Sequence, residues 1–220
     1  MRTAGSKSWR VSVDHQDQVL HVALCIRDHY QLNIVQDDVP PRLNWKVPIG
    51  KIPVDLQHSE ELPDQWLWWW RQLVRASSLR QLGSDLSGSD EFRDLKDSNE
   101  TAQYFDPFED FQSLNSQPQL KHLATESWRR AIEWSKPLYQ NSRVPTRAAV
   151  KEVAESVLAE RQVLPERINA GVIILAVNGV WSTIFHPGVL LCSTSTYAND
   201  SLFAVELKKT IESSLRDRDH

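Results

Sequence analysis

The chain has 220 residues, of which 40% are hydrophobic and 25% charged, and its formal net charge is −4. This composition is typical of a globular protein with a sizeable core. The longest apolar run, GVIILAV from Gly171, is far too short to cross a bilayer, and no apolar stretch of a signal peptide follows the basic N-terminus. Since the two cysteines, Cys25 and Cys192, each lie within an apolar run, we expect buried free thiols, a cytoplasmic location and no membrane contact.

The N-terminal part shows three patterns of regular structure before the tryptophan-rich stretch. Residues Trp9–Val13 alternate in polarity, which predicts a short strand, and Asp17–Tyr30 has an apolar stripe at helical spacing. The sequence LNIV at 32–35 predicts a second strand. Residues 46–56 contain repeated prolines, so we expect an extended segment there.

The stretch QWLWWWRQLV, residues 65–74, holds four of the nine tryptophans and predicts a helix that begins near Pro63 and ends near Gly83. On this helix Trp66, Trp69 and Trp70 share one broad apolar face, which predicts burial in the core.

Trp68 points almost opposite to that face, beside Arg71 and Arg75. A tryptophan flanked by arginines has the composition of a hot spot in a protein interface, so we interpret Trp68, Arg71 and Arg75 as a partner-binding surface. The alternative is that another segment covers this side and the helix is buried all round.

Residues 84–117 form an acidic connector that is rich in serine, asparagine and glutamine and lacks a sustained apolar period. Such a composition predicts a partly mobile segment. Its only basic residues are Arg93 and Lys96, against nine acidic residues: Asp85, Asp90, Glu91, Asp94, Asp97, Glu100, Asp106, Glu109 and Asp110.

Within the connector, YFDPFEDF places Tyr104, Phe105, Phe108 and Phe111 among acidic residues. Aromatic anchors supply apolar contact while the acids steer the segment toward a basic surface, so we interpret these four as partner-binding residues. Two destinations stay open. The segment either docks on its own chain, near Arg71 and Arg75 or Arg129 and Arg130, or it is a linear motif for a separate protein.

The C-terminal part predicts two helices, a β-meander and a last helix. The first helix runs from Pro118 to Trp134 and is ended by Pro137, and the second opens at Pro145. Asn178-Gly179 lies between two apolar runs, which predicts a type I′ hairpin. The turn HPG, the strand VLLC and a helix from about Ser201 follow.

Because helices precede a meander and alternating βα units are absent, the predicted fold class is α+β, with a small antiparallel β-meander in the C-terminal half. The predicted organisation has three parts: an N-terminal α+β part over 1–83, the connector over 84–117, and a C-terminal part over 118–220.

His21, Cys25 and His29 are spaced at i, i+4 and i+8 along one side of their helix. Histidine and cysteine one turn apart can share a metal, which makes a metal-dependent hydrolase the alternative function. Structural zinc sites draw ligands from two elements, however, and the sequence holds no CxxC or HExxH motif. We therefore expect no metal and interpret Cys25 as a buried thiol flanked by histidines at the edge of the apolar stripe.

No Walker loop, GxSxG or GxGxxG motif occurs, and we expect no cofactor. The sequence therefore favours a cytoplasmic protein that acts by binding another protein, as an interaction or regulatory protein without catalytic activity. A third possibility is association with nucleic acid. The candidate contacts are Arg71, Arg75, Arg80, Arg129 and Arg130, but no long basic run supports it, and we expect no nucleic-acid partner.

Overall fold

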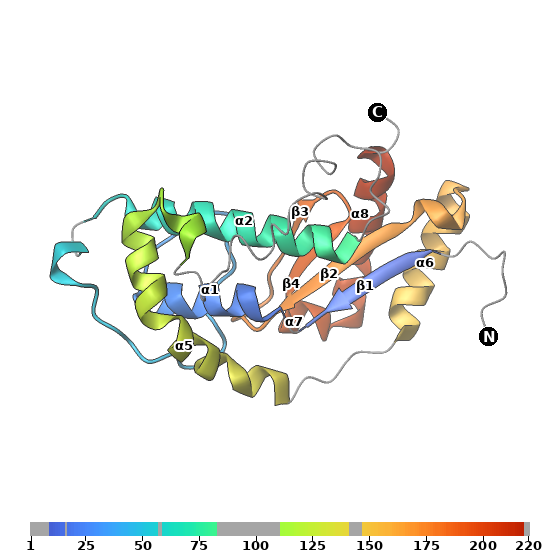
Figure 1. Cartoon of the computed structure of the whole chain (residues 1–220). Coiled ribbons are helices and arrows are strands. Elements are labelled where there is room, and N and C mark those ends of the chain that lie inside the picture. The colour runs from blue at the N-terminus through green and yellow to red at the C-terminus, as the bar shows by residue number, and fades with distance from the viewer. Residues whose placement is uncertain (1–8, 16, 57–58, 83–110, 141–146, 218–220) are drawn as a thin grey trace, which may run out of the picture.

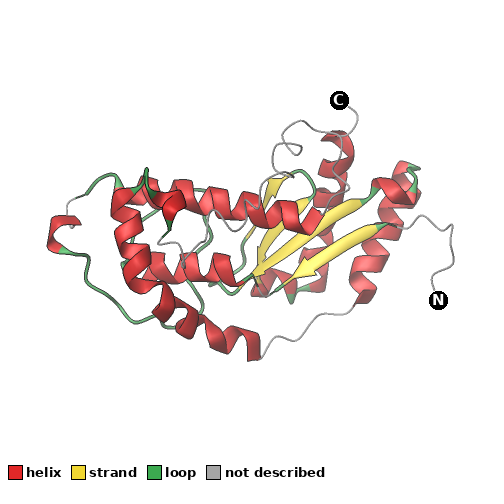
Figure 2. Cartoon of the chain, in the orientation of Figure 1, coloured by secondary structure: helices red, strands yellow, loops and turns green. Residues whose placement is uncertain are grey.

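One four-stranded sheet with helices on both faces organises the protein (Figures 1 and 2). The computed structural model describes residues 9–15, 17–56, 59–82, 111–140 and 147–217. The strand order is β1-β2-β4-β3. The bounds are Arg10–Asp14 for β1, Asn169–Leu175 for β2, Ser182–His186 for β3 and Val189–Ser193 for β4.

The sheet is mixed. Strand β2 pairs in parallel with β1 on one side and with β4 on the other, and β3 pairs antiparallel with β4. Every residue of β2 is buried, which is expected for a parallel strand covered on both faces and explains its unbroken apolar run. The fold class α+β is confirmed, but the prediction of a purely antiparallel meander is wrong.

The predicted hairpin at Asn178-Gly179 is also wrong, because β4 lies between the two runs that were expected to pair. Gly179 has the expected positive φ of 73°, but Asn178 does not share it, and a type I′ turn needs both. The hairpin that forms joins β3 to β4 through Pro187 and Gly188, where Gly188 has a φ of 86°.

Two core clusters lie on the two faces of the sheet because side chains alternate along its strands. On β2, Ile173 and Leu175 join the first cluster, whereas Val172 and Ile174 join the second. The first cluster is built with helices α1 (Gln18–His29), α2 (Leu62–Leu82) and α5 (Pro118–Gln140). The second is built with α6 (Arg147–Arg161) and α8 (Asp200–Asp217).

Short helices complete the architecture: η1 (Val54–Leu56), η4 (Gln112–Leu114), η5 (Pro165–Arg167) and α7 (Thr194–Tyr197). Among the helices that the structure describes, none is long and apolar enough to cross a membrane.

Two local predictions failed for identifiable reasons. Helix α5 continues through Pro137 to Gln140: the proline removes the hydrogen bond of its own missing N–H, but the three residues after it stay helical. Residues 32–35 form no strand. They belong to the irregular segment between α1 and α2, in which Leu43 makes an isolated antiparallel bridge with Val177.

The predicted N-terminal and C-terminal parts both supply strands to the one sheet, since Val11 of β1 aligns with Ala170 of β2. The proposed domain boundaries stay a prediction. Side chains of β1 and β2 also hold the last turn of α2. Arg10 and Asn169 donate to the carbonyl oxygen of Leu82 at 3.2 and 2.8 Å, and Ser12 donates to that of Gln81 at 2.9 Å. The last described residues of α2 are therefore tightly positioned. The predicted cap Gly83 lies outside the described residues.

Candidate functional site

The buried face of α2 carries the three tryptophans that the helical period predicts for the core. Trp66, Trp69 and Trp70 are all fully buried. The rings of Trp66 and Trp70 stack with centroids 5.5 Å apart. Their indole N–H groups donate to the carbonyl oxygens of Ala23 and Asp38, at 3.1 and 3.3 Å. Both N–H groups are therefore hydrogen-bonded. This prediction is confirmed.

The opposite face of α2 is formed by Trp68, Arg71, Gln72, Arg75 and Leu79, which we call the α2 outer surface. Arg71 and Arg75 are exposed, whereas Trp68 and Leu79 are half-buried. Trp68 packs partly against the first core cluster, so its indole is neither fully covered nor fully in solvent. Trp68 therefore contacts the core and still contributes to the surface, and its role as a partner-binding residue stays a prediction.

Asp38 fixes the guanidinium of Arg71 on this surface. The Asp38 carboxylate accepts from Nε at 2.7 Å and from Nη2 at 3.2 Å, a two-point geometry that holds the planar group in one orientation. The hydrogen bond to Asp38 raises the pKa of Arg71. Arg75 makes no ion pair with any residue that the structure describes.

The segment that carries Asp38 is itself anchored by a buried polar cluster on α1. Arg27 is 3% exposed and donates to the carbonyl oxygens of Pro40 and Pro41 at 2.6 and 2.8 Å. Asp28 accepts from the backbone N–H of Leu43 at 2.8 Å. Because the bond from Arg27 to Pro40 is buried and the other two are partly buried, the segment beside α2 is a firm support for the Arg71 guanidinium.

Val35 is an exposed apolar residue that the sequence reasoning missed. Its exposed fraction is 83%, and it lies three residues before Asp38, within about 10 Å of chain from the Arg71 ion pair. It belongs to the same irregular segment as Asp38. The apolar run LNIV suggested a half-buried strand, and no local signal marked Val35 as the residue left in solvent.

Of the four connector aromatics, only Phe111 is described, and it lies in the core. It is fully buried and meets Trp69 edge to face, with centroids 6.3 Å apart and planes at 82°. Its φ of 52° turns the chain into η4, where Leu114 is also buried. In this conformation Phe111 contacts its own chain rather than a partner. Tyr104, Phe105 and Phe108 lie outside the described residues.

His21, Cys25 and His29 are each engaged in the protein interior. His21 donates from Nδ1 to the carbonyl oxygen of Asp17 at 2.8 Å and accepts at Nε2 from the N–H of Ala176 at 3.2 Å. Burial lowers the pKa of His21 and raises the pKa of the Cys25 thiol to about 12, so the thiol resists the ionisation that metal binding needs.

His29 is bonded at Nδ1 to the carbonyl of Pro48, and its ring lies against those of Tyr30 and Trp134. Across the described parts of the chain, no group of three or more histidine, cysteine or acidic side chains is placed to hold a metal ion. The geometry therefore lends no support to the metal-dependent alternative.

The arginines considered for nucleic acid are divided among separate contacts. Arg80 pairs with the buried carboxylate of Asp17 at 2.8 Å, and Arg130 lies 3.6 Å from Glu126. The guanidinium of Arg129 lies over the ring of Trp128 at 5.3 Å. Phosphate binding relies on clustered free cations, and these contacts reduce the number available.

Comparison with known proteins gives no relative to guide the interpretation: no family model, no curated protein and no solved structure matches the chain.

Proposed function

We propose that the protein acts by binding another protein through the α2 outer surface. The observation that carries the proposal is the arrangement of the half-buried Trp68 beside the exposed Arg71 and Arg75. Tryptophan and arginine are the residue types most enriched at interface hot spots, and a ring already held on one side loses little conformational freedom on binding.

The charge on this surface indicates what kind of partner it fits. From Gln65 to Leu82 the chain has three arginines and no acidic residue. Asp38 and Asp17 neutralise two of them, which leaves Arg75 to attract an acidic group. The proposed partner therefore presents a carboxylate for Arg75 and an apolar patch for Trp68.

The proposed compartment is the reducing cytoplasm. Cys25 belongs to the core cluster on one face of the sheet and Cys192 to the cluster on the other, and both are buried free thiols. A disulfide between them would require the core to open. Titration of the unfolded protein, purified without reductant, should find two reactive thiols per chain.

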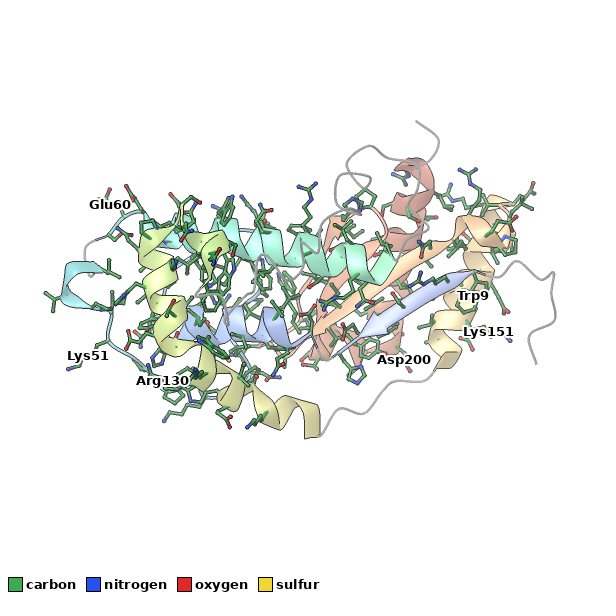
Figure 3. All side chains as sticks on the ribbon, viewed as in Figure 1. Trp9, Lys51, Glu60, Arg130, Lys151 and Asp200 are labelled. Carbon is green, nitrogen blue, oxygen red and sulfur yellow. The ribbon has the colours of Figure 1, made fainter. Side chains whose placement is uncertain are left out.

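The test is affinity capture from the native host with the intact protein and two variants. Arg75→Glu reverses the available charge, and Lys151→Glu makes the same change on α6, which Figure 3 shows at the far end of the molecule. A partner captured by the intact protein and by Lys151→Glu, but lost with Arg75→Glu, supports the surface. A partner captured equally by all three binds elsewhere and contradicts it.

A further inference from the structure

Strand β1 is an edge of the sheet: β2 pairs with one side of it, and among the described residues no strand lies beyond the other side (Figure 1). The backbone N–H of Arg10 donates to the carbonyl oxygen of Ile168 at 2.9 Å. In a parallel ladder the even-numbered residues of β1 therefore bond to β2, and the N–H and C=O groups of Val11 and Val13 point away from the sheet. Outward groups of this kind are a template for another strand.

The other edge strand, β3, is less suited to pairing with a further strand. Its register with β4 shifts between Ile184 and His186, and such an irregularity bends a strand and disrupts its outer edge. In β1, by contrast, all residues from Arg10 to Asp14 pair in one continuous register with β2, and no proline interrupts them. Strand β1 is therefore the regular edge of the sheet.

The sequence of β1, RVSVD, carries opposite charges at its two ends. Arg10 is exposed, and its guanidinium donates to two backbone carbonyl oxygens at 3.2 and 3.4 Å, with no carboxylate partner in the part of the chain that the structure describes. Asp14 accepts from the neutral side-chain amide of Gln81 at 2.9 Å. Ser12 also bonds to Gln81, so all three side chains lie on the face of the sheet that α2 covers.

Two copies of β1 fit each other when they run antiparallel about a two-fold axis at Ser12. Val11 then faces Val13 of the second copy, and each such pair exchanges two backbone hydrogen bonds, which satisfies all the outward groups of both strands. Arg10 lies directly opposite Asp14 of the second copy, in a non-hydrogen-bonded pair, where side chains come closest. A register shifted by two residues in either direction separates these opposite charges.

We propose that two copies of the chain associate through their β1 edges and join their four-stranded sheets into one continuous sheet. A second copy is the occupant of this edge because the strand is complementary in charge to itself. The two-fold axis is perpendicular to the sheet, so both α2 helices lie on the same face. Neither Trp68 nor Arg75 takes part in the pairing, which therefore does not depend on the proposed function.

Sedimentation equilibrium of the full chain, at about 1 to 100 µM, tests the association, and the intact protein should be a dimer at the upper end of this range. Arg10→Glu places carboxylates opposite each other, and Asp14→Arg does the same with guanidinium groups. Each change should raise the dissociation constant of the dimer by about tenfold or more. The double variant restores opposite charges and should dimerise again, which a loss caused by the contact of Arg10 with Leu82 would not allow.

A cysteine at the two-fold axis tests the register. Ser12→Cys places two thiols opposite each other within reach of a disulfide, so mild oxidation should give a covalent dimer. Ser182→Cys, at a half-buried position of β3, is the matched control and should stay uncoupled. The native Cys25 and Cys192 are buried and do not compete.

A chain that stays monomeric up to about 100 µM overturns the proposal and leaves this edge to a strand of another protein. A dimer that neither charge variant weakens uses another surface and also overturns it. The same holds if the double variant folds but stays monomeric, or if Ser182→Cys couples while Ser12→Cys does not. None of these results alters the capture of a partner through Arg75, so the two proposals fail separately.

Discussion

Phe111 packs edge to face on Trp69, two residues that are 42 positions apart in the chain and that close the acidic segment onto the helix it started from. The contact is fully buried on both sides. The contact gives a structural reason for the aromatic residue that follows the acidic residues Glu109 and Asp110: the buried ring of Phe111 returns the chain to the core.

Phe111→Ala should therefore lower the free energy of unfolding by about 3–5 kcal/mol, as expected for a buried phenylalanine that leaves a cavity. Urea denaturation measures the change. Phe185→Ala, at a half-buried position on β3, is the matched control and should cost less. If the two variants lost the same stability, the anchor role of Phe111 would be refuted.

Replacing a tryptophan by alanine should lower the free energy of unfolding by different amounts on the two faces of α2. Trp66→Ala should cost about 3–5 kcal/mol, because the ring is fully buried and its N–H bonds to Ala23. Trp68→Ala should cost clearly less, because only part of its ring contacts the core. Thermal and urea unfolding of both variants provide the comparison, and equal losses would show that Trp68 is a core residue.

Replacing glycine by alanine should cost more stability at Gly171 than at Gly179. A Cβ at Gly171 would lie 2.6 Å from the Cβ of Gln81, so Gly171→Ala must push the end of α2 off the sheet at a cost of about 1–3 kcal/mol or more. Gly179 has open space around it, and Gly179→Ala meets only the strain of a φ of 73°, about 1 kcal/mol. A larger cost at Gly179 than at Gly171 would contradict the close approach of α2 to β2.

The helical content could be predicted from the sequence, whereas the sheet order could not. Apolar stripes on α1, α2 and α8 follow from residues that are three and four apart, which is local information. The pairing of Val11 with Ala170 joins residues from opposite ends of the chain, and no local pattern encodes it. At Asn178-Gly179 the expected positive φ does occur at Gly179. No hairpin forms there, however, because β4 lies between the two strands that were expected to pair.

The candidate site could likewise be predicted only in part from the sequence. The helical period placed Trp68, Arg71 and Arg75 on one side of α2, as the structure shows. It could not show that Asp38 pairs with Arg71, that Val35 is exposed, or that Phe111 is buried. Each of those facts depends on where an irregular segment packs, which is set by contacts such as those of Arg27 with Pro40 and Pro41.

Because His21 is buried, we expect the folded protein to lose stability in mild acid. Its pKa is lowered in the folded protein, first by burial, while the unfolded chain has the ordinary value near 6.5. Above pH 6.5 both states are neutral and His21 adds no pH dependence. Below pH 6.5 the unfolded chain takes up a proton that the folded protein refuses, so stability falls by at most about 1.4 kcal/mol per pH unit.

Unfolding free energies between pH 7.5 and 5 measure this effect, and His21→Gln is the comparison because the other histidines remain in it. The intact protein should lose more stability than the variant as the pH falls. Parallel curves for the two proteins would show that His21 is not the responsible group.

The proposed binding surface is tested most directly by the dissociation constant of the purified partner for three proteins. These are the intact chain, Arg75→Glu and Lys151→Glu, with unfolding curves recorded to confirm that all three are folded. Arg75→Glu should raise the dissociation constant by roughly tenfold or more, a loss of at least about 1.4 kcal/mol, because it removes the available cation and adds a repelling charge. Lys151→Glu should leave it unchanged. Unchanged binding by Arg75→Glu, or equal weakening by both variants, would contradict the α2 outer surface as the binding site.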